Sequence, residues 1–182
     1  MPIYYPDILQ QHTAPRTLSY SAKDVMLYAL SIGMGADPLD ERELAFVFEE
    51  GLKVVPTAPT ILATEPGRYW AGEAPPIVVP KGLRESSFNY NLALHGEQKI
   101  EIHKTLPVAA TFHIEERTQS AFDKGKDKGA VIIQETTWND ASGERAVTLT
   151  RTVFARGDGG FGGPAAGAPA AHPMPARKPD LS

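Results

Sequence analysis

The 182 residues of this sequence include no cysteine. This absence excludes disulfides, thiolate zinc sites and a cysteine nucleophile, and it fits a reducing compartment. The sequence also lacks an apolar run long enough to cross a bilayer, and its first residues show no secretory signal. The last three residues, Asp-Leu-Ser, do not form a peroxisomal address of the Ser-Lys-Leu type. We therefore expect a soluble, cytoplasmic protein that does not associate with membranes.

Positive charge is also in short supply, with 18 Lys and Arg residues against 22 Asp and Glu residues. A general nucleic-acid binder needs a basic surface, so that class is not expected. An anionic ligand would have to be held by a local cluster of lysines or arginines. The sequence also lacks a P-loop, a dinucleotide fingerprint and a nucleophile elbow, and we expect neither a cofactor nor a metal.

Regular structure is expected only after an N-terminal arm, residues 1–13, in which two prolines oppose helix and strand. A helix is predicted to begin at Ser21, which forms a capping-box pattern with Asp24. Gly33 and Gly35 are expected to end this helix. Its apolar residues predict a face broad enough to be largely buried: Val25, Met26, Leu27, Tyr28, Leu30, Ile32 and Met34.

The pattern between the first helix and residue 88 is mixed. Residues 43–49 predict a short strand. Pro59 suits the first turn of a second helix that runs through Ile61 and Leu62. Residues 64–87 are rich in glycine, proline and charge, and a loop of this length inside a compact domain is usually functional or mobile.

The second half of the chain alternates between apolar and polar residues, which is typical of half-buried strands. A hairpin turn is expected at residues 139–143. Meandering antiparallel strands after a helical region indicate an α+β domain with its sheet packed on a helix. The predicted strands cover residues 97–104, 108–120, 130–138 and 144–156.

The last 26 residues are poor in large apolar side chains. Residues 157–163 are mostly glycine, and this composition predicts flexible backbone. They do not match the dinucleotide fingerprint, because no helix follows them. Residues 164–182 are rich in proline and alanine and predict an extended linker. Since a linker joins two parts, we expect a second domain that has been removed or is supplied by another chain.

Two segments carry candidate functional residues. Residues 94–98, Leu-His-Gly-Glu-Gln, are expected to form a polar turn that opens into a strand. His95 and Glu97 are two apart, so they would share a strand face and could form an acid–base pair, or simply be a turn residue and an edge charge. Residues 123–129 contain three lysines and two glycines, which fits either an anion site or a solvated loop.

Taken in order, several segments make the chain similar to the N-terminal half of the MaoC-like (R)-specific 2-enoyl-CoA hydratases. This is the hydratase 2 group, which includes the hydratase unit of peroxisomal multifunctional enzyme type 2. The resemblance covers roughly residues 16 to 163. The segments that carry it are Asp24–Gly35, Val55-Pro56-Thr57, Leu94–Gln98, Lys104–Pro107, Asp123-Lys124-Gly125 and Gly157–Gly163.

The resemblance implies a hot-dog fold over residues 14–163, an antiparallel sheet wrapped around a helix. This single hot dog would have an interrupted central helix that leaves room for an acyl chain. In the family, the catalytic Asp and His belong to a Gly-Asp-x-Asn-Pro-Leu-His motif in a second hot dog. That motif is absent here, and its nearest likeness, Met34–Asp40, has Gly35 and Asp40 at the two positions. The resemblance therefore implies no catalytic residue in this chain, which alone should be inactive.

The same resemblance assigns binding residues and partners. His95 and Gly96 would contact acyl-CoA, and Lys124 would contact a CoA phosphate, with Lys126 and Lys128 as close rivals. The expected partners are a trans-2-enoyl-CoA, a catalytic second hot-dog domain or subunit, and further copies of the chain in a homo-oligomer. Two alternatives stay open: a stand-alone hot-dog thioesterase, which needs a carboxylate on the central helix, and an acyl-CoA-binding or structural subunit that works only by pairing.

Overall fold

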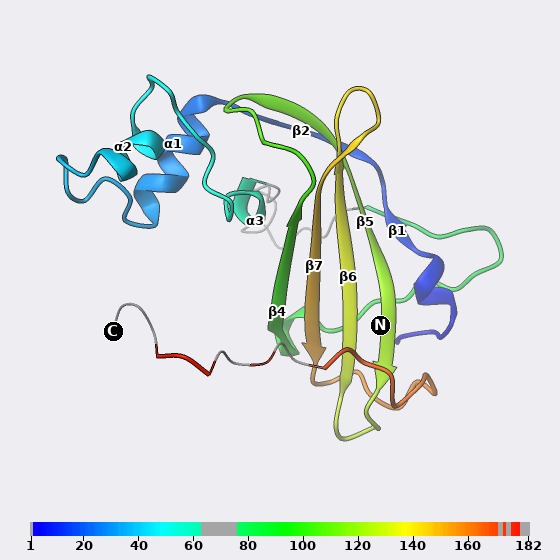
Figure 1. Cartoon of the computed structure of the whole chain (residues 1–182). Coiled ribbons are helices and arrows are strands. Elements are labelled where there is room, and N and C mark those ends of the chain that lie inside the picture. Colours follow the sequence, from blue (N-terminus) through cyan, green and yellow to red (C-terminus); the bar gives the residue numbers. More distant parts are fainter. Residues whose placement is uncertain (1, 63–75, 171–172, 174–175, 179–182) are drawn as a thin grey trace.

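The computed structural model of the chain describes residues 2–62, 76–170, 173 and 176–178. Figure 1 shows a tall antiparallel sheet with a small group of helices beyond one of its ends. No helix among the described residues is long and apolar enough to cross a membrane.

The sheet has seven strands in the order β3-β1-β5-β6-β7-β4, and β2 also pairs with β5. All pairings are antiparallel. The four long strands confirm the alternation read from the sequence, although their bounds differ by a few residues. The strands are β1 (His12–Thr13), β2 (Arg16–Tyr20), β3 (Ile77–Val78), β4 (Ala93–Ile102), β5 (Ala110–Asp123), β6 (Ala130–Asn139) and β7 (Arg145–Ala155).

One face of the sheet, called here the covered face, holds the two apolar clusters that the described residues form. Residues directly opposite each other on paired strands share a face, so Trp138 and Val147 mark the covered face near the helices and Ile132 and Val153 mark it at the far end. The cluster near the helices includes Val25, Phe112 and Leu149, and the far cluster includes Ile3, Ile8 and Phe88.

The N-terminal segment is part of this packing. Regular structure is present in it, contrary to what its prolines predicted: a 3-10 helix, η1 (Asp7–Gln10), is followed by β1, which joins the sheet. Ile3 and Ile8 are buried against the far end of the covered face.

The first helix, α1 (Ala22–Ser31), begins as predicted, with the Ser21 amide donating to Asp24 Oδ2 at 2.8 Å. The prediction that its apolar face is largely buried is wrong. Only Val25 and Ala29 are buried, while Leu27 and Leu30 are 61% and 54% exposed. The reason is the place of the helix: α1 and the next helix, α2 (Glu41–Val47), lie beyond the end of the sheet (Figure 1). Of the residues of α1, only Val25 belongs to the apolar cluster that packs on the sheet.

Residues 43–49, predicted as a strand, lie mostly in the helix α2 (Glu41–Val47). Asp40 caps it by accepting from the Arg42 amide at 3.0 Å, and the residues that follow, from Glu41 to Ala45, are good helix formers. The predicted helix at Pro59 is confirmed as α3 (Pro59–Leu62). Of the predicted loop 64–87, residues 64–75 lie outside the described residues, and β3 falls in the remainder.

Candidate functional site

His95 lies on β4, at the edge of the sheet, and not in a turn as the sequence suggested. It pairs with Val153 on β7, whereas Glu97 pairs with Thr152, and the register shifts between them. This β-bulge at Gly96 inserts one residue and reverses the alternation. His95 therefore belongs to the covered face and Glu97 to the opposite face. The expectation that the two side chains share a face is wrong, and a direct acid–base pair is excluded in this geometry.

Gly96 leaves little room for a side chain at the bulge. A Cβ atom added here would lie 3.1 Å from the carbonyl oxygen of Thr152, closer than most Cβ contacts. Any larger side chain would force β4 and β7 to shift, so the exposed edge beside His95 depends on a glycine.

Lys124 follows β5 at the end of the sheet far from the helices. Its ammonium group donates to the carbonyl oxygen of Ala165 at 2.8 Å and lies 5.6 Å from the centre of the Phe122 ring. Lys124 is half-buried, whereas Lys126 and Lys128 are exposed. Of the three lysines, Lys124 is thus hydrogen-bonded to the backbone of the segment that follows the sheet, and the other two face solvent.

Asp123 holds this lysine loop against the glycine-rich segment. Its carboxylate accepts from the amides of Gly125 at 2.8 Å and of Gly160 and Gly162 at 2.7 Å. Burial raises the pKa of Asp123, but hydrogen bonds from these glycine amides outweigh it, so the pKa is lowered overall. A carboxylate with three such donors is an anchor for two loops.

The glycine-rich segment 157–163 is packed, which corrects the expectation of flexible backbone. A Cβ atom at Gly159 would collide with the carbonyl oxygens of Gly125 and Gly129. Gly160 has φ +87°, a conformation that favours glycine. The glycines therefore allow one backbone to lie directly on another.

His95 and Lys124 lie toward the same end of the sheet but do not touch. The register runs from Ala93 through Ala155 and Ala130 to Asp123, so the two sites stand near the two ends of one transverse row. Strands β4 and β5 are separated by β7 and β6, which places them about 14 Å apart. A ligand that contacts both residues must span the width of four strands.

A row of polar side chains, called here the polar row, crosses the middle of the covered face. The register places Gln98, Arg151, Gln134 and Thr118 side by side on β4, β7, β6 and β5. Arg151 Nη2 donates to Gln134 Oε1 at 2.6 Å and lies 3.7 Å from a carboxylate oxygen of Glu116. Our sequence reading missed these residues, although period-two alternation from Leu149 to Val153 already puts Arg151 on their face.

Strands β4 and β5, the outer two of the four long strands, both bulge directly beside the polar row. The register of β4 shifts between His95 and Glu97, and that of β5 shifts between Thr118 and Ser120. Bulges re-aim side chains and are common beside functional sites. Neither bulge has a sequence signal apart from Gly96, because the one on β5 lies at Gln119 in an ordinary alternating run.

A small cavity adjoins the polar row on the β5 side. Its volume is about 50 Å³, enough for one or two water molecules or a small polar group. Gln134, Glu116 and Thr118 form part of its wall, and residues of η1 and the 86–90 segment form another part. It is too small for an acyl chain.

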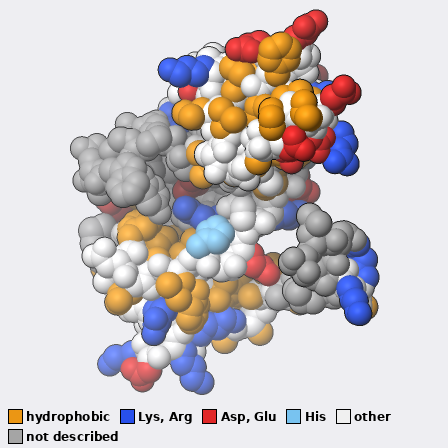
Figure 2. All heavy atoms as spheres, turned by 90° about the vertical axis from the view of Figure 1, so that its left-hand side faces the viewer, with side chains coloured by type: hydrophobic (Ala, Val, Ile, Leu, Met, Phe, Trp, Pro, Cys, Tyr) orange, Lys and Arg blue, Asp and Glu red, His pale blue; other side chains and the backbone are white. Residues whose placement is uncertain are grey.

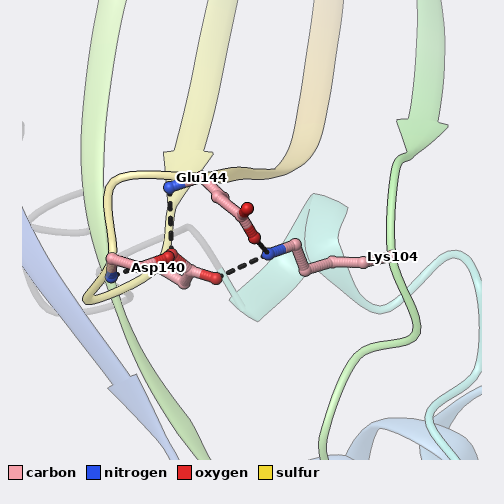
Figure 3. A network of polar contacts seen from close by, with 4 residues as sticks. Lys104, Asp140 and Glu144 are labelled. Carbon is pink, nitrogen blue, oxygen red and sulfur yellow. Dashed lines mark hydrogen bonds and ion pairs between the residues drawn. The ribbon is translucent and has the colours of Figure 1, made fainter.

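A separate ion-pair network lies at the end of the sheet nearer the helices (Figure 3). The ammonium group of Lys104, in the loop after β4, contacts Asp140 at 2.6 Å and Glu144 at 2.7 Å across the β6–β7 hairpin. Hydrogen bonds from Lys104 and Ser142 hold the pKa of Asp140 well below its usual range. Lys104 is therefore engaged in tying the hairpin to the loop.

The positions that correspond to a catalytic pair in Met34–Asp40 are structural here. The Gly35 amide donates to Glu43 Oε2 at 2.8 Å, and Asp40 accepts from Arg42 Nε at 3.0 Å. Hydrogen bonds from Arg42 lower the pKa of Asp40 to about 2. No group of three side chains suited to a metal occurs among the described residues.

Most of the exposed large apolar side chains lie in two places, and the others include Ile77 and Val78 on β3 and Ile102 at the end of β4. On the helical end they gather on the upper lobe in Figure 2. At the edge of the sheet they precede and begin β4. The helical set is Leu27, Leu30, Ile32, Leu39, Phe48 and Ile61, and the edge set is Tyr90, Leu92 and Leu94.

Comparison with known proteins gives a consistent result. A family model described as the MFE-2 hydratase 2 N-terminal domain matches residues 18–157. The chain is 33% identical over 181 residues to the enoyl-CoA hydratase ChsH3 of Mycobacterium tuberculosis, covering all of this chain and 59% of that protein. The chain spans about half the length of the curated relatives it matches.

Solved structures agree. A MaoC-like dehydratase from Phytophthora capsici has a TM-score of 0.72 and 30% identity, covering 98% of this chain and 58% of that one. The ChsH1–ChsH2 complex of Mycobacterium tuberculosis, with a TM-score of 0.52 and 10% identity, covers 84% of this chain and 88% of that one and shows likeness of fold alone.

Proposed function

Because the chain belongs to the family of MFE-2 hydratase 2 N-terminal domains, within the MaoC-like enoyl-CoA hydratases, we propose that it is the non-catalytic half of an (R)-specific 2-enoyl-CoA hydratase. In this role it binds the acyl chain and the CoA of a trans-2-enoyl-CoA. A second hot dog then adds water across the double bond.

The fold prediction is confirmed. The seven-stranded antiparallel sheet with few helices, together with its structural neighbours, is an α+β hot-dog fold. The described part of the central region is the four-residue α3, after Pro56 and with Pro59 in its first turn.

The observation that carries the non-catalytic role is the state of Gly35 and Asp40. Gly35 has no side chain. Asp40 accepts hydrogen bonds from Arg42 at the start of α2, and its pKa is lowered to about 2. A carboxyl that stays ionised at neutral pH is a poor proton donor, and no imidazole stands in this segment. The acid–base chemistry must then come from a partner.

Substrate contact is supported by the arrangement at the far end of the sheet. His95 and Gly96 stand at the open edge of the covered face, and the lysine loop stands across the sheet from them. The separation of about 14 Å suits an extended molecule such as CoA. Lys124 can bind a phosphate once its ammonium group releases the carbonyl oxygen of Ala165. The exposed Lys126 and Lys128 add positive charge beside Lys124.

Pairing with a second hot dog is supported by two open surfaces. Among the described residues β4 pairs only with β7, so its outer edge offers free backbone groups. The exposed apolar residues of the helical end and of the edge provide area to bury. The same surfaces allow homo-oligomers. As for the compartment, the absence of cysteine is compatible with the cytoplasm.

A hydration assay tests this role. The 182-residue chain should not hydrate crotonyl-CoA, whereas mixing it with a hot dog that carries the Gly-Asp-x-Asn-Pro-Leu-His motif should give turnover on longer enoyl-CoAs. The matched control is the motif-bearing hot dog alone. Clear hydration by the chain alone would contradict the half-enzyme role, and release of free CoA would favour the thioesterase alternative.

A further inference from the structure

We propose that the polar row is a specificity-determining subsite, which favours acyl-CoA ligands whose acyl group carries a hydroxyl or carbonyl oxygen over unsubstituted ones. This inference rests on the proposed function, because it assumes that the acyl group lies along the covered face. It adds the class of acyl group that this face selects.

On the central strands β6 and β7, the polar row separates the two apolar clusters of the covered face. Ile132 and Val153 lie on one side of it, and Leu149 and Trp138 lie on the other. Aliphatic side chains would continue both clusters without a desolvation penalty, whereas a half-buried arginine and a buried glutamine carry one. Recognition of a polar group of the ligand explains why the polar row is present despite this desolvation cost.

The chemistry of the row favours a neutral oxygen over a second carboxylate. Glu116 lies 3.7 Å from Arg151 and accepts from the Thr136 hydroxyl at 3.2 Å, so the guanidinium charge is already balanced. A guanidinium has five N–H donors, and the partners of Arg151 among the described residues are Gln134 and Glu116. Its side chain keeps 34% of its surface accessible, which leaves donors for a ligand oxygen.

The position of the row fits an acyl chain that starts near His95. On the covered face of β4 the bulge makes Gln98 the next residue after His95, one row further along. That row is about 7 Å away along the strand. The cavity of about 50 Å³ beside Gln134 and Thr118 has room for a hydroxyl or carbonyl group but not for the chain itself.

The test compares two ligands of equal length by calorimetry on the full chain: decanoyl-CoA and decanoyl-CoA with a hydroxyl on a middle carbon. The wild type should bind the hydroxylated ligand about tenfold more tightly, the effect of one hydrogen bond to a charged donor. The double variant Arg151→Met with Glu116→Gln removes both charges together, so no unpaired carboxylate remains. It should lose the preference while keeping its affinity for decanoyl-CoA.

Two further variants keep the test decisive. Arg145→Met removes an exposed arginine at the start of the same strand and should keep the preference. Gln134→Met leaves both charges in place and should weaken the preference even if the double variant does not fold. Equal binding of both ligands by the wild type overturns this inference and leaves the proposed function standing. Binding of neither ligand overturns both.

Discussion

At the scale of single residues, Asp123 shows how one side chain orders two loops. Its carboxylate joins the amide of the lysine loop to two amides of the glycine-rich segment. The Asp-Lys-Gly motif thus divides its work: the aspartate fixes the turn, the lysine carries the charge, and the glycine, with φ +106°, allows the turn.

Asp123→Asn is expected to lower the free energy of unfolding by about 1–3 kcal/mol at pH 7, because a charged acceptor is replaced by a neutral one with a single oxygen. The pKa of Asp123 is lower in the folded chain than its ordinary value of 3.8. Its contribution is therefore fully present above that value and is lost as the pH falls through the folded pKa. Urea unfolding at pH 7 and pH 3 measures both effects.

The matched control for this prediction is Asp127→Asn, in the same loop but exposed. It should leave the unfolding midpoint unchanged. If Asp123→Asn unfolds at the same urea concentration as the wild type at pH 7, the carboxylate does not stabilise the two loops.

At the scale of elements, β4 depends on its bulge. Gly96→Ala places a Cβ 3.1 Å from the Thr152 carbonyl, so the edge strand must shift. We expect a loss of about 1–3 kcal/mol in stability, as for other overpacked sites, and weaker acyl-CoA binding because His95 moves with the strand. Thermal unfolding and calorimetry measure the two effects. Glu97→Ala, exposed on the opposite face, is the control, and unchanged binding by Gly96→Ala would separate the bulge from ligand contact.

The same element shows where prediction from sequence reaches its limit. Alternation located the four long strands because each buries one face. The capping box at Ser21 and the first-turn proline Pro59 located two helices. Alternation of apolar and polar residues could not reveal the bulges, because an inserted residue leaves the local composition unchanged. The sequence therefore placed His95 and Glu97 on one face. Residues 43–49 were predicted as a strand because of their apolar run, and the cap that Asp40 provides at the start of α2 was not recognised.

At the scale of the whole molecule, burial could not be predicted for α1 because it depends on where the sheet ends. Leu27 and Leu30 fit a buried helix face by spacing, yet α1 lies beyond the sheet and leaves them exposed. The candidate residues were found by resemblance, whereas the polar row required the register of four strands. Apolar surface that one chain leaves open is the natural place for another chain to cover.

The exposed apolar residues of α1 provide a direct test of pairing with a second hot dog. Leu27→Asp and Leu30→Asp should each weaken that complex more than tenfold, because each fully buried leucine contributes about 1.5–3 kcal/mol and a buried aspartate adds a desolvation cost. Calorimetry with a motif-bearing hot dog measures the affinity. Glu115→Gln, an exposed change on β5 that lies on the face opposite the covered face, should bind as the wild type does. Wild-type affinity in both aspartate variants would show that the partner covers the β4 edge without contacting the helical end.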